Sequence, residues 1–201
     1  IVKKCNPSGS VKKVDVTDAA STHVYYLNEK AEIGGKTLFA DVKVRQALSL
    51  ALDRQTMADA IVYAKAADGI VPYTVLNRPG KKTEFRKKAE SYLAATANAE
   101  AAKSLLKEAG VTASEYEFAI TVASYDEDHI AMAELAKAAW NALGFKVSLN
   151  VLKPAEVIET TVDDAGVETS TGTDVWANPY KTALETGNFE VIALDLVATS
   201  A

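Results

Sequence analysis

Hydrophobic residues recur at helical spacing between residues 39 and 64, with one charged interruption. The apolar face of the first part comprises Val44, Ala47, Leu48, Ala51 and Leu52, which follow the i, i+3, i+4, i+7, i+8 pattern. The face of the second part comprises Met57, Ala60, Ile61 and Ala64. Asp41 and Asp53 precede the two parts, where a carboxylate can accept the free N–H groups of a first helical turn. The stretch therefore predicts two consecutive helices that change direction at Asp53 and bury both apolar faces in one core.

Strands are predicted at four places along the chain. Apolar and polar residues alternate at 116–122 and 145–151, and β-branched and aromatic residues dominate 22–28. An apolar run at 189–198 has the composition of a buried strand, although Asp195 interrupts it.

Helices are predicted between these strands, at 98–109 and 126–143. Gly110 and Gly144 follow them, as left-handed residues commonly do at helix C-termini. Trp140 falls on the apolar face of the second helix, so we expect it in the core. The order strand, helix, strand, helix is typical of an α/β fold with a largely parallel sheet.

Later segments give weaker patterns. Pro154 at a first-turn position predicts a helix over about 154–164, and the acidic, threonine-rich residues 165–175 are expected to form an exposed loop. A last helix over about 176–186 then leads into the final strand. Residues 1–21 are interpreted as an irregular lead-in, and 68–97 as a long connection.

Composition limits the function classes. The chain has 201 residues, is 48% hydrophobic and 24% charged, and has a formal net charge of -5, so it has ordinary globular proportions. The acidic balance gives no electrostatic reason to expect nucleic acid or an anionic membrane as a partner. The basic run at 81–88 contains one aromatic residue, Phe85, and is interpreted as a solvated face. The single cysteine, Cys5, cannot form an internal disulfide.

Candidate catalytic and metal-binding residues are few. The run Asp126, Glu127, Asp128 and His129 has ligand-type side chains, yet the helix dipole alone favours acids in a first turn. We therefore expect helix capping there and no metal. His23 and Cys5 are isolated in the sequence, and no serine lies in a nucleophile-elbow pattern. The sequence predicts a protein that is not an enzyme.

Two spaced motifs carry a family resemblance. The first comprises Phe39, Asp41, Val44, Arg45, Ala47, Asp53 and Arg54, and the second comprises Ala102, Leu105, Leu106, Ala109 and Gly110. With YYLN before them and GIVP between them, in the same order from about residue 22 onwards, the chain resembles the extracellular solute-binding proteins of ABC importers, in the oligopeptide- and dipeptide-binding group (family 5).

The resemblance implies one lobe of a type II periplasmic-binding-protein-like fold, with a mixed, mostly parallel sheet flanked by helices over residues 22–201. It implies the C-terminal lobe of a longer two-lobed protein, in keeping with the start at Ile1 and the stop just behind a strand. The implied partners are a small solute such as an oligopeptide, a missing second lobe and the membrane permease of an ABC importer. The implied location is extracytoplasmic, in the periplasm or on a cell-surface lipoprotein, and no cofactor is implied.

The resemblance also suggests solute contacts. Counting from Phe189, the family's tryptophan and acidic residue fall at Leu196 and Thr199, and its upstream arginine falls at Leu184. Asp195 is the nearest acid; it either contacts ligand or faces solvent at a strand edge. Trp176, before the last helix, either lines the cleft or packs in the interior. These departures leave the solute class open.

Two other functions stay open from the sequence. A sensing or docking module could keep this lobe without transport, and an intact sequence fused to a signalling domain would indicate that role. An α/β enzyme domain is the less favoured alternative, since no catalytic constellation supports it.

Overall fold

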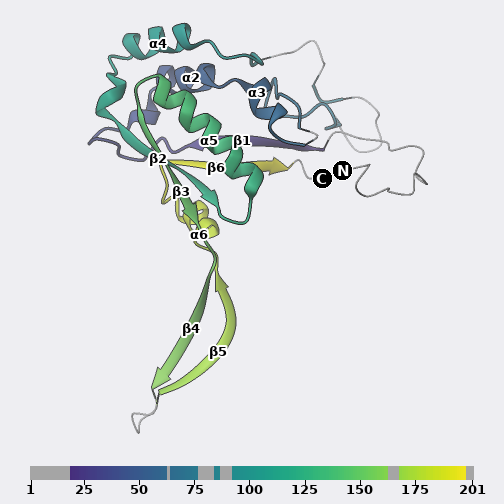
Figure 1. Cartoon of the computed structure of the whole chain (residues 1–201), viewed down its shortest axis with the longest axis vertical. Coiled ribbons are helices and arrows are strands. Elements are labelled where there is room, and N and C mark those ends of the chain that lie inside the picture. Colours follow the sequence, from purple (N-terminus) through teal and green to yellow (C-terminus); the bar gives the residue numbers. More distant parts are fainter. Residues whose placement is uncertain (1–18, 63, 77–83, 87–91, 163–167, 198–201) are drawn as a thin grey trace, which may run out of the picture.

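A four-stranded sheet forms the centre of the molecule (Figure 1). The structure, a computed structural model, describes residues 19–62, 64–76, 84–86, 92–162 and 168–197. Within these ranges, it describes the backbone but not the side chains of residues 155–177. The strands are β1 (Ser21–Leu27), β2 (Glu117–Ala123), β3 (Lys146–Leu152) and β6 (Val191–Val197), in the order β1-β6-β2-β3. β2 pairs in parallel with β3 and β6, whereas β1 is antiparallel to β6. The predicted mixed, mostly parallel sheet is confirmed.

Helices cover both faces of this sheet. The elements are η1 (Leu38–Ala40), α2 (Val42–Ala51), α3 (Arg54–Asp59), α4 (Ala99–Glu108), η2 (Ala113–Glu115), α5 (Glu127–Ala142) and α6 (Pro179–Thr186). Figure 1 shows α2, α4 and α5 on one side of the sheet and α6 on the other. None of the described helices combines the length and the apolar character that a membrane crossing requires.

The core lies between the sheet and the α2–α4–α5 layer. Phe118 of β2 makes edge contacts with Phe39 and Phe145, with ring centroids 5.2 and 5.5 Å apart. Trp140 packs beside Phe118 and is 1% exposed, as the sequence predicts. Its indole Nε1–H donates to the Leu48 carbonyl at 2.9 Å, which ties α5 to α2 and satisfies a buried polar group.

The first family motif stabilises the start of α2 and the corner between α2 and α3. The Asp41 carboxylate accepts from the Lys43 N–H and caps α2, and the Asp53 carboxylate accepts from the Thr56 N–H and caps α3. The Arg45 guanidinium donates to the Phe39 and Ala40 carbonyls, at 2.7 and 3.0 Å. Asp41 and Arg45 therefore hold the start of α2. Asp53 begins α3 directly after α2 ends, which confirms the predicted change of direction.

The second helix of this pair is shorter than predicted. α3 ends at Asp59, so Ala60, Ile61 and Ala64 do not continue its apolar face, and Ala60 and Ala64 are exposed. The buried contribution of α3 comes from Met57 and Ala58. The physical reason is that the chain leaves the core here, so that Ile61 and Ala64 line a cavity and are not part of the core cluster.

Two predictions for the segment after β3 are wrong. In place of a helix at 154–164 and a loop at 165–175, β4 (Ala155–Val162) and β5 (Glu168–Ala177) form an antiparallel hairpin that extends away from the sheet (Figure 1). Valine, isoleucine and threonine fill much of both strands, and their branched Cβ atoms favour extended backbone over the helix that Pro154 suggests. The last helix is confirmed with a later start, because Asn178 caps α6 and Pro179 occupies its first position.

Candidate functional site

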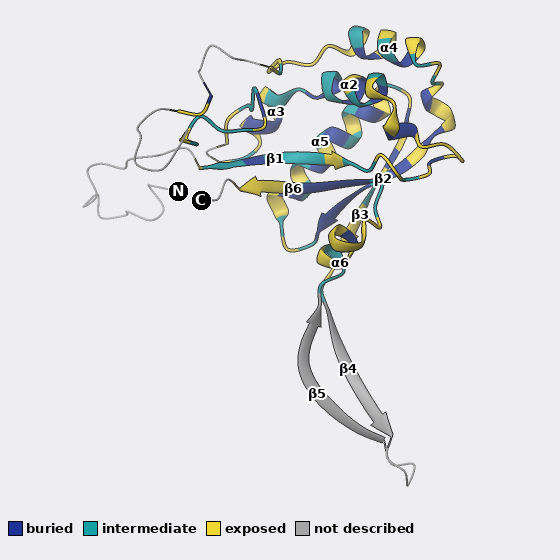
Figure 2. Cartoon of the chain, turned by 180° about the vertical axis from the view of Figure 1, so that it is seen from behind, coloured by how far each residue is buried: buried dark blue, intermediate teal, exposed yellow. Residues whose placement is uncertain are grey.

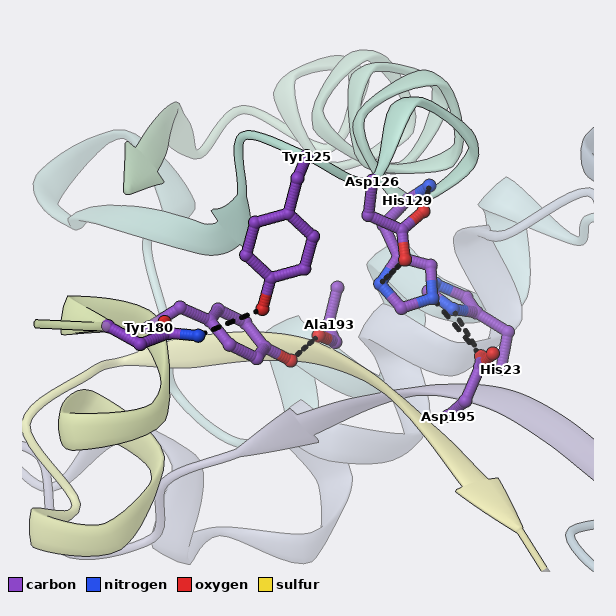
Figure 3. A network of polar contacts seen from close by, with 8 residues as sticks. His23, Tyr125, Asp126, His129, Tyr180, Ala193 and Asp195 are labelled. Atoms are coloured by element: carbon purple, nitrogen blue, oxygen red, sulfur yellow. Dashed lines mark hydrogen bonds and ion pairs between the residues drawn. The ribbon is translucent and has the colours of Figure 1, made fainter. Parts of the chain in front are cut away.

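Strand register brings His23 and Asp195 together. The antiparallel β1–β6 ladder pairs these residues directly, so their side chains leave the sheet on the same face. The His23 Nδ1 lies 3.2 Å from the Asp195 Oδ1 (Figure 3).

The first turn of α5 adds a second histidine. Asp126 caps α5 by accepting the His129 N–H at 2.9 Å, which fixes His129 above β6. The His129 Nε2 lies 3.2 Å from the Asp195 Oδ1, and the two imidazole rings are 4.4 Å apart between centroids. His23, His129 and Asp195, called the His–Asp cluster below, therefore come from three elements that are remote in sequence (Figure 3).

His129 meets a carboxylate at each ring nitrogen. Its Nδ1 lies 3.2 Å from the Asp126 Oδ2, and its Nε2 faces Asp195. A neutral imidazole has one N–H and one lone pair, so it satisfies one of these carboxylates by donation. Only an imidazolium, or an imidazole with a cation beside its lone pair, suits both.

His23 lies in a more apolar setting. Its side chain is 16% exposed, and its ring stands edge-on to Tyr25 at 5.2 Å. Burial, with the neighbouring His129, lowers the pKa of His23 to about 4, although Asp195 opposes this shift. His23 is therefore neutral near pH 7. Its Nδ1–H is directed at Asp195, and its buried Nε2 has no hydrogen-bond partner in the described part of the chain.

The His–Asp cluster lines a cavity of about 1290 Å³. The other walls come from α2, α3 and the connection 64–73, together with Arg86. Arg86 is buried, forms an ion pair with Asp68 and stacks over the Tyr73 ring at 4.3 Å. The prediction of a solvated basic face is wrong for Arg86, because this pair draws its side chain into the cavity wall; Lys81, Lys82, Lys87 and Lys88 lie outside the described residues.

A second group of polar contacts supports the start of α5. The Tyr180 hydroxyl donates to the Ala193 carbonyl at 2.5 Å, and the Asn178 amide donates to the Tyr125 hydroxyl at 3.2 Å (Figure 3). α6 is thereby tied to β6 and to the turn that carries Asp126. This connection positions the capping residue from which His129 is held.

The structure separates the solute contacts that the sequence suggests. Asp195 lines the cavity, and its side chain is 48% exposed. Its strand, β6, lies inside the sheet, but β2 pairs with β6 only at Val191 and Ile192. At Asp195, β6 therefore has one neighbouring strand, β1. Leu196 and Leu184, both 42% exposed, lie outside the cavity wall, on β6 and α6. Trp176 is in β5, where side chains are not described, and Thr199 lies outside the described residues.

Sequence reasoning missed the two histidines. It interprets His23 as isolated and assigns the acids near His129 to capping alone, yet the fold places both imidazoles on one carboxylate. The capping role of Asp126 is confirmed. The available signal was that Asp195 and His23 both interrupt predicted strands, but pairing them requires the β1–β6 register.

Comparison with known proteins identifies the family. The model of the bacterial extracellular solute-binding proteins, family 5 Middle, matches residues 6–198. The chain belongs to this family. The predicted resemblance is confirmed, and family 5 proteins are solute-binding proteins rather than enzymes. No curated protein matches the chain.

Solved structures with the same fold include solute complexes. OppA of Listeria monocytogenes bound to peptide has a TM-score of 0.64 at 18% identity, over 96% of this chain and 34% of that one. AppA of Bacillus subtilis in complex with a nonapeptide has 0.59 at 18%, over 98% and 35%. AgaA of A. tumefaciens R10 in complex with agropinic acid has 0.62 at 17%, over 90% and 30%. The family 5 chain thus spans about a third of the length of these structures, and the likeness confirms its fold class.

Proposed function

We propose that this chain is one lobe, over residues 22–201, of an extracytoplasmic solute-binding protein that captures a small solute and delivers it to an ABC importer. The observation that carries the proposal is the family match, which extends over residues 6–198. Neighbours of the same fold hold peptides and agropinic acid, so the proposed solute is peptide-like or another small polar molecule.

The cavity supports solute capture. Its volume of about 1290 Å³ exceeds the roughly 300–1,000 Å³ of common small-molecule pockets, so it has room for an extended solute. The three arginines of the wall have partners within the chain. Arg45 pairs with Glu29, Arg54 donates to the Ser49 hydroxyl, and Arg86 pairs with Asp68. A solute would therefore meet the charges of Arg45 and Arg86 already balanced by carboxylates, whereas Arg54 donates to a neutral hydroxyl. The half-exposed Asp195 offers an acceptor for a solute amino group.

Closure of two lobes completes the proposed mechanism. A solute favours a closed state only by the contacts that it makes in that state and not in the open one. The second lobe would supply such contacts, and the closed pair would present a surface to the membrane permease. The resemblance is the basis for four proposed solute contacts, Leu196, Thr199, Trp176 and Leu184. The fifth proposed contact, Asp195, lines the cavity.

The test begins with the full-length protein that contains this chain, purified from its host. Native mass spectrometry should reveal a co-purifying solute, and calorimetry should then compare its binding to the full-length protein and to the 201-residue chain. We expect the single lobe to bind on the order of 100-fold more weakly or worse, because its contacts lack those of a linked second lobe.

A matched pair of variants tests the contact residue. Asp195→Asn should weaken solute binding, whereas Glu127→Gln, which removes one exposed acid outside the cavity wall, should not. Equal affinity of the lobe and the full-length protein would contradict two-lobe closure. Fusion of the lobe to a signalling domain in the intact sequence would favour the sensing role.

A further inference from the structure

We propose that His23, His129 and Asp195 bind a divalent transition-metal ion of the zinc type, with a fourth coordination position open to the cavity. Two imidazoles and one carboxylate are a donor set that zinc accepts in sites that keep one position for water or another ligand. The proposal goes beyond solute transport, since it requires neither a second lobe nor a particular solute.

The donor spacing fits a single ion. Zinc bonds of about 2.0–2.1 Å in a tetrahedron place neighbouring donor atoms about 3.3–3.4 Å apart. The Asp195 Oδ1 lies 3.2 Å from the His129 Nε2 and 3.2 Å from the His23 Nδ1. One donor atom from each of the three residues lies within 4.8 Å of the others, so a small rotation of the imidazole rings closes the remaining edge.

Asp126 orients His129 as an outer-shell carboxylate does in metal sites. Its Oδ2 lies 3.2 Å from the His129 Nδ1, which places the proton on Nδ1 and the lone pair on Nε2, toward Asp195. Without an ion, this lone pair would face the Asp195 carboxylate unless the ring is protonated. A metal ion would satisfy the lone pair and both carboxylates at once.

His23 can supply a neutral nitrogen. The imidazole has two ring nitrogens, and a metal requires an unprotonated nitrogen from each histidine. The buried His23 Nε2 lacks a partner among the described residues, so rotation of this ring to present either nitrogen sacrifices no second hydrogen bond. The imidazole is therefore free to exchange one weak contact with Asp195 for a metal bond.

The local charge favours a dication. Asp126, Asp128 and Asp195 all line this part of the cavity. Of the cationic side chains in the wall, Arg45 and Arg86 are paired with the Glu29 and Asp68 carboxylates, and Arg54 and Lys65 belong to other segments, α3 and the connection 64–73. Because His23, His129 and Asp195 also line the cavity, the ion's open position would face it. There a water molecule or a donor atom of a bound solute would complete the coordination.

The experiment titrates zinc chloride into the metal-free 201-residue chain near pH 7, with isothermal calorimetry and histidine NMR. We expect one ion per chain and perturbation of both imidazole rings. His129→Gln and Asp195→Asn should each weaken binding by more than about 100-fold. Asp126→Ser, which keeps a capping oxygen, should weaken it by about 10- to 100-fold as an outer-shell loss does. Cobalt should give the absorption of a tetrahedral site without sulfur ligands.

Two controls exclude other ligands. Cys5→Ser and Glu127→Gln should leave zinc affinity unchanged, and magnesium should not compete, because it prefers an octahedral shell of oxygen atoms. Thermal unfolding of each variant verifies that it is folded. If His129→Gln does not fold, Asp195→Asn still tests the proposal, because the Asp195 side chain is half-exposed. Three results would overturn the proposal. The chain could fail to bind zinc, it could still bind zinc after both Asp195→Asn and His129→Gln, or Cys5→Ser could abolish zinc binding. None of these outcomes would contradict solute transport.

Discussion

The two ends of one face of the central sheet differ in character. At one end, Tyr25 of β1 lies edge-on to Trp140 at 5.6 Å, opposite the buried Ala193 of β6. Two residues further along the ladder, the same face carries His23 and Asp195. Figure 2 shows the change along β6, which passes from buried to exposed over its length.

α5 links these two ends. Its C-terminal half contributes Trp140 to the apolar end, and its first turn contributes His129 to the polar end. The apolar end has interlocking aromatic rings and a satisfied indole. Each end also contains one buried polar atom without a partner among the described residues, the Tyr25 hydroxyl at the apolar end and the His23 Nε2 at the polar end. The comparison indicates that packing at the apolar end supplies most of the folding free energy of this face. The polar end can therefore keep histidine and aspartate side chains that do not stabilise the fold.

Truncation at the apolar end should have the largest effect. Trp140→Ala should lower the free energy of unfolding by about 3–5 kcal/mol, because it leaves a large cavity and removes the donor to the Leu48 carbonyl. Urea denaturation of the 201-residue chain measures this loss. Trp140→Phe, which keeps most of the ring, should cost clearly less. A loss below about 1 kcal/mol for the alanine variant would mean that the apolar end is not the centre of stability.

Sequence reasoning succeeded where the deciding interactions are local. The caps at Asp41, Asp53, Asn98 and Asp126 were predictable, since each carboxylate or amide oxygen accepts from an N–H two or three residues later. The burial of Trp140 followed from helical spacing on one element. Patterns of this kind need no knowledge of the partner strand.

It failed where the outcome depends on distant segments. The β4–β5 hairpin requires each strand to pair with the other, and Pro154 gave a local helix signal that this pairing overrides. The His–Asp cluster required a register between residues 172 positions apart. A slip of one residue would turn His23 to the opposite face of the sheet, so no local pattern could place it beside Asp195.

Another part of the cavity wall, formed by Asp68, Tyr73 and Arg86, gives a pH test of its polar groups. The Tyr73 hydroxyl, which donates to Asp68, and the Arg86 guanidinium hold the pKa of Asp68 below its usual value. A lowered carboxyl pKa contributes stability above the unfolded pKa of about 3.8, and this contribution is lost as pH falls through the folded pKa. Asp68→Asn should therefore be less stable than the parent chain at neutral pH, with a gap that narrows in acid.

Thermal unfolding midpoints of the two chains, compared from about pH 7 to below pH 3.8, measure this gap. Glu32→Gln serves as the control, because this exposed acid lies outside the described helices and outside the cavity wall. A gap that stays constant across this range would mean that the Asp68–Arg86 pair does not contribute through its charge.

The smallest effect on stability is expected at the polar end. His23→Leu should change the free energy of unfolding by less than about 1 kcal/mol, since it removes a buried nitrogen without a described partner and leaves Asp195 its contact with His129. Tyr25→Leu, two residues along the same face, should cost more, because loss of the edge contact with Trp140 outweighs removal of the Tyr25 hydroxyl, which is also buried without a described partner. Urea denaturation of both variants compares the two ends within one strand. If His23→Leu cost as much as Tyr25→Leu, His23 would belong to the stabilising core, and the polar end would not be free to serve binding.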